Sequence, residues 1–257
     1  MDRRFVGKVV AITGGAGGIG RAAAVRFASE GAHVLLVDVA AAGLADSAGA
    51  VEQAGGRAIT VEADVTRAAD VERYVRAAVD HFGGLDCLFN NAGILGAVSA
   101  LVDYPEDVFD RVVAVNLKSV WLGMKLAAPA IIARGGGAIV NTASIAGLRG
   151  TPNLIAYTAT KHAVVGMTRT ASLELVRHGV RVNAVCPAPI DTPMAEAVET
   201  GFSAANPQAV HDRLARSIPM RRYGRPDEVA ALVVFLCSPD AAYINGGIYP
   251  VDGGAMA

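Results

Sequence analysis

The stretch "KVVAITGGAGGIG", residues 8–20, decides the fold expected for this chain of 257 residues. Its apolar first half, residues 8–13, predicts a buried strand, and the glycines after it predict a tight turn. A helical pattern over residues 18–29 follows directly. The N–H groups at the start of such a helix attract phosphate, so the stretch predicts the strand, turn and helix of a nucleotide site.

The rest of the chain alternates short apolar runs with longer helical patterns. The other predicted strands are residues 33–38, 58–64, 85–91, 137–144, 180–187 and 247–254. The other predicted helices are residues 41–54, 67–82, 106–133, 156–178 and 226–237. Strands that are apolar along their length are typical of a parallel sheet covered on both faces. The alternation therefore predicts an α/β fold, a doubly wound parallel sheet with helices on both faces.

Residues 188–222 interrupt the alternation with four prolines and only short helical patterns. A long irregular segment between regular elements is usually functional. This segment follows a predicted strand, and open α/β sheets bind ligands beyond the carboxyl ends of their strands. We therefore expect residues 188–222 to be a substrate lid within a single domain of residues 1–257.

The bulk composition excludes several classes of function. A net charge of -1 offers no basic surface for nucleic acid, and no long apolar window free of charge indicates a membrane span. The three cysteines form no CxxC pair, which argues against a disulfide framework or a zinc site and favours a reducing cytoplasm. The five histidines show no metal-ligand spacing, so we expect no metal.

The cofactor end of the site is predicted from the glycine turn and from Asp38. Gly14, Gly18 and Gly20 allow the tight turn and a close backbone approach to a phosphate. Asp38 ends the next strand, where a carboxylate accepts hydrogen bonds from ribose hydroxyls and repels a 2′-phosphate. This position favours NAD over NADP, although Asp38 could merely cap the strand end. Asp64 and Val65 could hold the adenine, or Asp64 could cap the next helix.

The chemical end of the site is predicted from polar residues near other strand ends. Asn91 follows one strand, Ser144 closes another, and Asn116 lies inside the helix predicted over residues 106–133. Tyr157 and Lys161 are four residues apart, which puts them on one helical face. Each of these features alone has an ordinary explanation as a turn, a cap or a chance pair.

Taken together, these motifs closely resemble the short-chain dehydrogenase/reductase family in its "TGxxxGxG … NNAG … N … S … YxxxK" form, along essentially the whole chain. The resemblance implies a Rossmann-type domain that transfers hydride between a nicotinamide and an alcohol or ketone. It implies Tyr157 as the general acid or base and Ser144 as the group that holds the substrate oxygen. Lys161 would bind the nicotinamide ribose and lower the pKa of Tyr157, and Asn116 would keep a bent helix and a water in a proton relay.

The resemblance also implies the lining of the site. The cofactor-binding residues expected from it are Gly14, Gly17, Gly18, Ile19, Gly20, Asp38, Val39, Asp64, Val65, Asn91, Ala92, Gly93, Tyr157, Lys161, Pro187, Ile190 and Thr192. The expected substrate pocket is Leu95, Ser144, Ile145, Ala146, Leu154, Tyr157, Ala188, Pro189 and Met194. The family usually has Pro-Gly where this chain has Pro187-Ala188, so we expect an altered loop and pocket there.

This mostly apolar pocket predicts a neutral secondary alcohol or ketone: a cyclic, aryl or aliphatic ketone, a hydroxysteroid or a diol. The alternative is reduction of a 3-oxoacyl thioester on acyl carrier protein or CoA, for which Arg134, Arg149, Arg221 and Arg222 could supply a basic surface. A non-catalytic NAD-binding sensor is a remote alternative. Similar proteins are usually homotetramers, and the apolar helices over residues 106–133 and 156–178 would pair across a two-fold axis.

Overall fold

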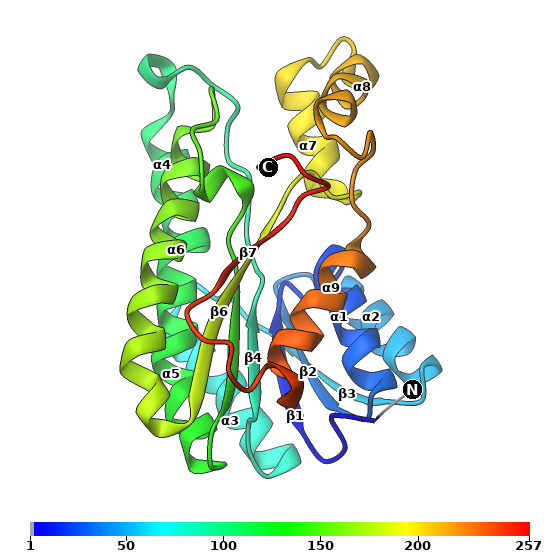
Figure 1. The fold of residues 1–257 in the computed structure, drawn as a ribbon, viewed down its shortest axis with the longest axis vertical. Coiled ribbons are helices and arrows are strands. Elements are labelled where there is room, and N and C mark those ends of the chain that lie inside the picture. The colour runs from blue at the N-terminus through cyan, green and yellow to red at the C-terminus, as the bar shows by residue number, and fades with distance from the viewer. Residues whose placement is uncertain (1–2) are drawn as a thin grey trace.

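Seven parallel strands form one sheet between two layers of helices (Figure 1). The computed structural model describes residues 3–257, so the first two residues of the predicted domain lie outside the described part. The strands are β1 (Val9–Thr13), β2 (His33–Asp38), β3 (Arg57–Glu62), β4 (Cys87–Asn90), β5 (Gly137–Thr142), β6 (Val180–Pro187) and β7 (Ile248–Val251). Their order across the sheet is β3-β2-β1-β4-β5-β6-β7. The direction of winding changes between β1 and β4, and such a switch point is where open α/β sheets bind ligands.

The alternating side chains of the strands build two cores, one on each face of the sheet. Val9 and Ala11 of β1 face one core, while Val10 and Ile12 face the other. The first core is covered by α3 (Ala68–Phe82), α5 (Ser119–Ala133) and α6 (Ile155–Leu175). The second is covered by α1 (Gly18–Ser29), α2 (Ala41–Gln53) and α9 (Pro226–Cys237). The predicted Rossmann-type fold is confirmed, and the strands at the centre are apolar because both of their faces are buried.

The long helix predicted over residues 106–133 is divided in the structure. It consists of α4 (Glu106–Val113), a π-helical turn (Ala114–Lys118) and α5. In that turn the Ser119 N–H donates to Ala114 O, five residues back, and the bypassed carbonyl of Val115 accepts from the Ser119 hydroxyl instead. One extra residue in a turn bends the helix, and such turns occur frequently at functional sites. Asn116 lies in this turn.

Residues 188–222 contain more regular structure than the sequence predicts. They hold α7 (Pro193–Phe202) and α8 (Pro207–Ser217), each with proline in its first turn. Proline suits that position because its missing N–H would have no partner inside the helix. The pair stands over the carboxyl ends of the strands, at the same end of the molecule as the C-terminus (Figure 1). Within residues 3–257, no helix has the length and apolar character needed to cross a membrane.

Candidate active site

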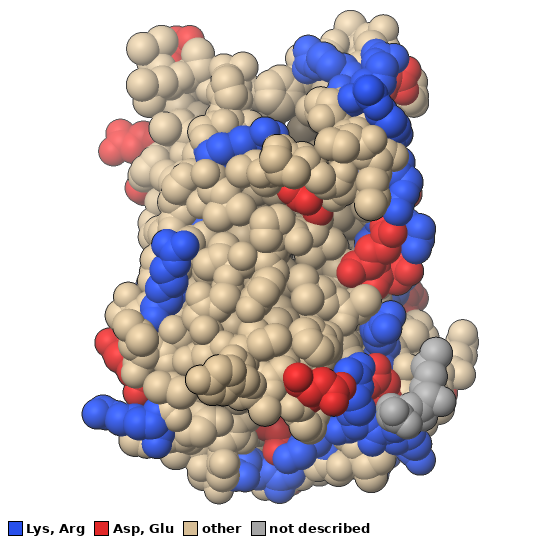
Figure 2. All heavy atoms as spheres, in the orientation of Figure 1, with Lys and Arg blue, Asp and Glu red and all other residues tan. Residues whose placement is uncertain are grey.

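A cavity of about 460 Å³ lies where the strands end. Its walls come from the glycine turn, the ends of β2, β4, β5 and β6, the first turns of α6, and α7 with α8. Figure 2 shows a notch above this cavity, between the part of the molecule that contains α7 and α8 and the part on the opposite side. A hollow of this size beyond the carboxyl ends of parallel strands is suited to a small ligand or a cofactor.

The glycine turn joins β1 to α1 by a very close approach of the backbone. Gly14 and Gly18 have φ angles of 68° and 52°, a conformation that side chains disfavour. A Cβ on Gly20 would lie 2.0 Å from Gly14 O. No side chain caps α1, and its first residues line the cavity. The start of α1 therefore presents N–H groups and the positive end of its dipole to the cavity.

Asn91 connects this turn to the neighbouring strands. Its amide group donates to Thr13 O (3.2 Å) and Gly14 O (3.4 Å), and its Oδ1 accepts from the Thr142 hydroxyl (3.2 Å). The Thr13 hydroxyl in turn accepts from the N–H groups of Asn91 (3.0 Å) and Ala92 (3.1 Å). The ends of β1, β4 and β5 are therefore held together by side chains at the floor of the cavity.

Asp38 ends β2 and lines the cavity. Its two carboxylate oxygens accept from the N–H groups of Ala16 and Ala40, each at 3.1 Å. A carboxylate offers about four lone-pair sites, so these two bonds leave acceptor capacity toward the cavity. Asp38 thus caps the strand end and is also available to a ligand; the two interpretations of the sequence are compatible.

Lys161 and Tyr157 lie side by side on α6. Lys161 is buried, its Nζ donates to Thr142 O at 2.7 Å, and it lies 5.5 Å from the centre of the Tyr157 ring. Burial lowers the pKa of Lys161 from its ordinary 10.5 to about 8. Tyr157 is half-buried in the cavity wall. Burial raises the pKa of its phenol, and the nearby Ser144 hydroxyl opposes that rise.

The pKa of Tyr157 therefore departs from the sequence-based expectation. We expect Lys161 to lower it, but desolvation is the largest effect that the protein's own groups exert, and its direction is upward. The physical reason is that the walls around the phenol disfavour its charged form, while the ammonium is engaged by Thr142.

Ser144 and Asn116 complete the polar wall of the site. Ser144 is buried after β5, where its Oγ accepts from Ala146 N (3.1 Å) and lies 3.5 Å from Pro187 O. Asn116 is fully buried, and its amide forms two 2.8 Å hydrogen bonds with the backbone N–H and C=O of Ile94. These bonds tie the π-helical turn to the loop after β4.

A family model described as enoyl-(acyl carrier protein) reductase matches residues 14–256. Levodione reductase from Leifsonia aquatica is 44% identical over 256 residues, which cover 99% of this chain and 96% of that protein. Cyclohexanol dehydrogenase from Acinetobacter sp. (strain SE19) is 40% identical over 253 residues, 98% of this chain and 96% of that protein. The crystal structure of levodione reductase superposes with a TM-score of 0.96 at 43% identity, covering 98% of each chain. That of NAD⁺-bound xylitol dehydrogenase gives 0.93 at 36% identity, covering 98% of this chain and 100% of the other.

The chain belongs to the short-chain dehydrogenase/reductase family.

Most of the residues that the sequence predicts for this short-chain dehydrogenase/reductase site line the cavity. Those that line it are Gly14, Gly17, Gly18, Ile19, Asp38, Asn91, Ala92, Gly93, Leu95, Ser144, Ile145, Ala146, Leu154, Tyr157, Lys161, Pro187, Ala188, Pro189, Ile190, Thr192 and Met194. Those that do not are Gly20, Val39, Asp64, Val65 and Asn116. Gly20 and Asn116 support the wall from behind. The Asp64 carboxylate accepts from the N–H and hydroxyl of Thr66, so it caps the turn before α3.

Ala188 fits its loop without strain. Among the described residues, the non-glycine residues with positive φ are Asn153 and Arg221, so Ala188 has a backbone conformation that alanine adopts readily. Its N–H donates to Val251 O at 3.1 Å, and its side chain lies in the cavity wall. The altered loop and pocket expected at Ala188 therefore involve no strained backbone at this residue, and the difference from a Pro-Gly loop stays a prediction.

Sequence reasoning missed several residues of the site. Thr13 and Thr142 are polar residues at the ends of apolar strands. Their position at the carboxyl ends of the strands could have identified them as residues of the site. Val198 and Phe202 on α7, Leu214 on α8, and Tyr223 in the segment after α8 also contribute to the wall. These four looked like ordinary apolar positions because nothing in the sequence tells which way a lid helix turns.

Two alanine substitutions in the glycine turn should have different effects. Gly20→Ala should lower the melting temperature, because its methyl group would collide with Gly14 O. Gly17→Ala should leave the melting temperature unchanged and weaken cofactor binding, because a Cβ there meets no protein atom within 4 Å but enters the cavity. Thermal unfolding and cofactor titration measure the two effects. Equal melting temperatures for both variants would contradict the close approach at Gly20.

The buried ammonium of Lys161 should make stability depend on pH. Between pH 8 and 10.5 the unfolded chain holds a proton on this lysine that the folded chain has lost, so the contribution of Lys161 to stability should rise with pH. Relative to Lys161→Met, the free energy of unfolding of the wild type should gain roughly 3 kcal/mol between pH 7 and pH 10.5. Urea unfolding at a series of pH values measures this difference. A difference that does not change with pH would show that the lysine titrates normally.

Proposed function

We propose that this protein is an NAD-dependent dehydrogenase/ketoreductase that acts on a neutral, mostly apolar secondary alcohol or ketone, with cyclic substrates the first choice. The observation that carries the proposal is the convergence of Ser144, Tyr157 and Lys161 on a cavity whose other end is a glycine turn and an uncapped helix. The three side chains are suited to proton transfer to a carbonyl oxygen, and the glycine turn with its helix is suited to binding a pyrophosphate.

The residues present fit a nicotinamide dinucleotide. Gly17 leaves open space beside the start of α1, because a Cβ there would meet no protein atom within 4 Å, and Asp38 has free lone pairs for ribose hydroxyls. Lys161 would reach the nicotinamide ribose, and Ile190 and Thr192 would hold the carboxamide. When bound, the cofactor supplies or accepts the hydride.

Tyr157 is the proposed proton donor in reduction and acceptor in oxidation. Its raised pKa keeps the phenol protonated at neutral pH, so it has a proton to give to a carbonyl oxygen. Ser144, beside it, would donate a hydrogen bond to the same oxygen as negative charge develops. In oxidation, the positive charge of the cofactor and of Lys161 would favour the phenolate.

Lys161 and Asn116 would return the proton to bulk water. A pKa of about 8 lets Lys161 gain and lose a proton near neutral pH. Asn116 and its π-helical turn hold the Ile94 backbone in place behind Gly93, and a Cβ on Gly93 would lie 3.7 Å from Lys161 Nζ. A water at this point would complete the relay that the family resemblance implies.

The apolar wall supports the substrate class. Leu95, Ile145, Leu154, Met194 and Phe202 surround the space near Tyr157, and we propose residues 188–222, with α7 and α8, as the lid over it. The methyl group of Ala188 would narrow this space. Levodione reductase and cyclohexanol dehydrogenase, the relatives named above, support a cyclic ketone or alcohol.

Reduction of a 3-oxoacyl thioester is the second candidate. Figure 2 shows basic side chains gathered over α8, which could face an acidic carrier. Of the four arginines first considered, Arg134 pairs with Asp86 (3.2 Å) and Arg222 pairs with Glu228 (2.7 Å), so two of them are already engaged. This leaves a weaker basic surface than the sequence suggests.

We also propose a cytoplasmic homotetramer. Apolar side chains such as Trp121 on α5 and Leu173 on α6 are 45% and 77% exposed, which favours burial against another subunit. The middle of the face shown in Figure 2, over β6 and β7, has few charged side chains. Cys87, Cys186 and Cys237 are free thiols, which suits a reducing compartment.

Turnover of cyclic alcohols tests the proposal. We expect NAD-dependent oxidation of cyclohexanol and its derivatives, followed at the NADH absorbance, and slower reduction of acetoacetyl-CoA. Tyr157→Phe should lose at least about a thousandfold in kcat, because general acid–base catalysis contributes up to ~10⁴-fold, while NADH binding should persist. Turnover of the thioester alone would favour the second candidate. Normal activity of Tyr157→Phe would refute the role of Tyr157.

Asp38 should set the choice of cofactor. The wild type should prefer NAD to NADP by at least about tenfold in kcat/KM, since a carboxylate beside a 2′-phosphate is repulsive. Asp38→Asn keeps the shape and removes the charge, so the preference should shrink. Steady-state rates with both cofactors measure the ratio. A wild type that prefers NADP would contradict the proposal.

A further inference from the structure

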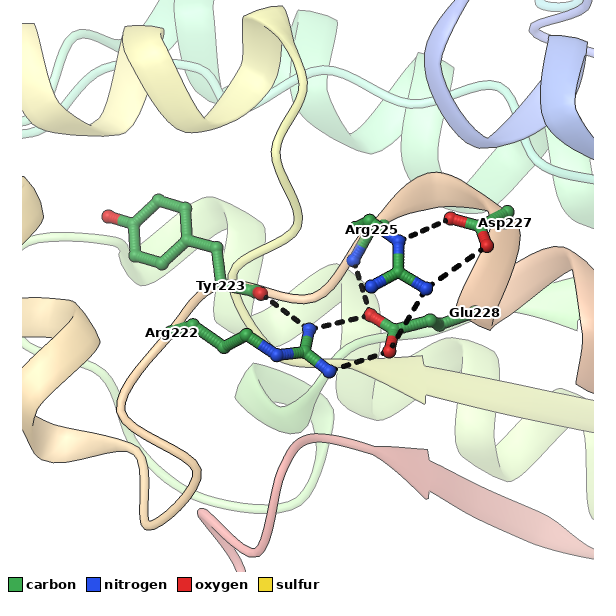
Figure 3. Close-up of polar contacts among 5 residues, drawn as sticks. All are labelled: Arg222, Tyr223, Arg225, Asp227 and Glu228. Carbon is green, nitrogen blue, oxygen red and sulfur yellow. Dashed lines mark hydrogen bonds and ion pairs between the residues drawn. The ribbon is translucent and has the colours of Figure 1, made fainter.

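The segment from Arg222 to Gly224 leaves the lid and enters α9, and it is fixed at both ends (Figure 3). The two Nη atoms of Arg222 each donate to the Glu228 carboxylate at 2.7 Å, and Nη1 also donates to Tyr223 O at 3.0 Å. Glu228 in turn accepts from Arg225 N at 2.7 Å. A bidentate arginine–carboxylate pair is geometrically specific, so it orients the backbone on both sides of Tyr223.

Gly224 connects the same segment to the first residues of the lid, 189–191. Its N–H donates to Pro189 O (3.0 Å), and its carbonyl accepts from Asp191 N (2.9 Å). A Cβ on Gly224 would lie 2.6 Å from Ile190 Cδ1, so a larger residue here would require the Ile190 side chain to shift. The backbone at Tyr223 is thus held by the first residues of the lid as well as by α9.

The Tyr223 ring is fixed from the lid side. It is 7% exposed, lines the cavity, and lies 4.2 Å from the His211 ring, centre to centre. His211 Nδ1 is 2.9 Å from the Glu199 carboxylate, so α7, α8 and the ring form one cluster. In Figure 3 the ring extends away from the Arg222–Glu228 pair.

The hydroxyl at the end of this fixed ring has no partner. Within residues 3–257, Tyr223 Oη is buried and forms no hydrogen bond. Burial raises the pKa of the phenol, and the Glu199 carboxylate, which is close enough to attract the hydroxyl but lies outside hydrogen-bonding geometry, raises it further, so the group keeps its proton. A buried hydroxyl without a partner is destabilising, and a ligand oxygen that accepted from it would remove that penalty.

We infer that Tyr223 Oη donates a hydrogen bond to a second oxygen of the substrate, remote from the carbon that reacts at Tyr157. The preferred substrates are therefore cyclic diols and hydroxyketones, above simple cyclic alcohols of the same size. The inference rests on the proposed function, because it takes the oxidised or reduced group to lie at Ser144 and Tyr157. Tyr223 is a specificity-determining residue on the lid side of the same cavity.

A purely structural role makes a different prediction. If the hydroxyl only stabilised the lid, for instance by turning toward Glu199, its removal would affect every substrate equally. The comparison of substrates with and without the second oxygen therefore separates substrate recognition from lid stability. The substitution Tyr223→Phe suits this comparison because it removes the hydroxyl and keeps the ring.

The experiment pairs one enzyme hydroxyl with one substrate hydroxyl. Wild type and Tyr223→Phe are assayed with NAD on cyclohexane-1,3-diol, cyclohexane-1,4-diol, 4-methylcyclohexanol and cyclohexanol. For at least one diol, we expect Tyr223→Phe to lose roughly 3- to 10-fold in kcat/KM, the range for one neutral hydrogen bond, with little change for 4-methylcyclohexanol. Tyr74→Phe is the matched control, because it removes the hydroxyl of a buried tyrosine in α3 that is no part of the cavity wall.

The outcomes separate the two proposals. A loss confined to a diol supports the inference, whereas equal losses on all four substrates, or none, overturn it. If the wild type oxidises none of the four, the proposed substrate class fails before the inference is reached. Melting temperatures of both variants check that the fold is intact.

Discussion

The side chain of Asn91 donates to two carbonyl oxygens of the glycine turn and accepts from Thr142, whose own carbonyl receives the ammonium of Lys161. This series of hydrogen bonds runs from the proposed phosphate site to Lys161, the neighbour of the proposed proton donor Tyr157, through three neighbouring strand ends. Its members are side chains and backbone at the floor of one cavity. The two halves of the site are therefore held in register by a few short contacts, and the sheet below fixes where those contacts can form.

The burial of Lys161 and Tyr157 has opposite effects on two neighbouring acids. Desolvation lowers the pKa of the lysine and raises that of the tyrosine, so burial shifts the protonation balance of each group toward its neutral form. A positively charged ligand beside the phenol would favour the phenolate, whereas burial favours the protonated phenol. Under the proposed function, the positive charge of an oxidised nicotinamide would oppose this effect of burial on the tyrosine.

Much of this structure could be predicted from the sequence, because its strands are apolar along their length and its glycines occupy a distinctive turn. β2, β6, α1 and α9 have the bounds that the sequence predicts. The family resemblance implies a bent helix at Asn116, but no motif predicts the π-helical turn itself, and Asn116 is held there by Ile94 from a different loop. α7 and α8 were missed because their helical patterns are short and their amphipathic faces meet a cavity instead of a core. The pKa of Tyr157 depends on how closely the walls approach, which is a property of packing that no motif encodes.

The contact between Ile190 and Gly224 brings the two ends of segment 188–222 together. Everything between them forms a loop that is already closed at its base, and lengthening a closed loop costs little additional entropy. Insertions, deletions and helix exchanges between residues 193 and 217 would therefore leave the sheet and the glycine turn unaffected. A fold arranged in this way can acquire new substrates during evolution while it keeps one cofactor and one proton-transfer apparatus.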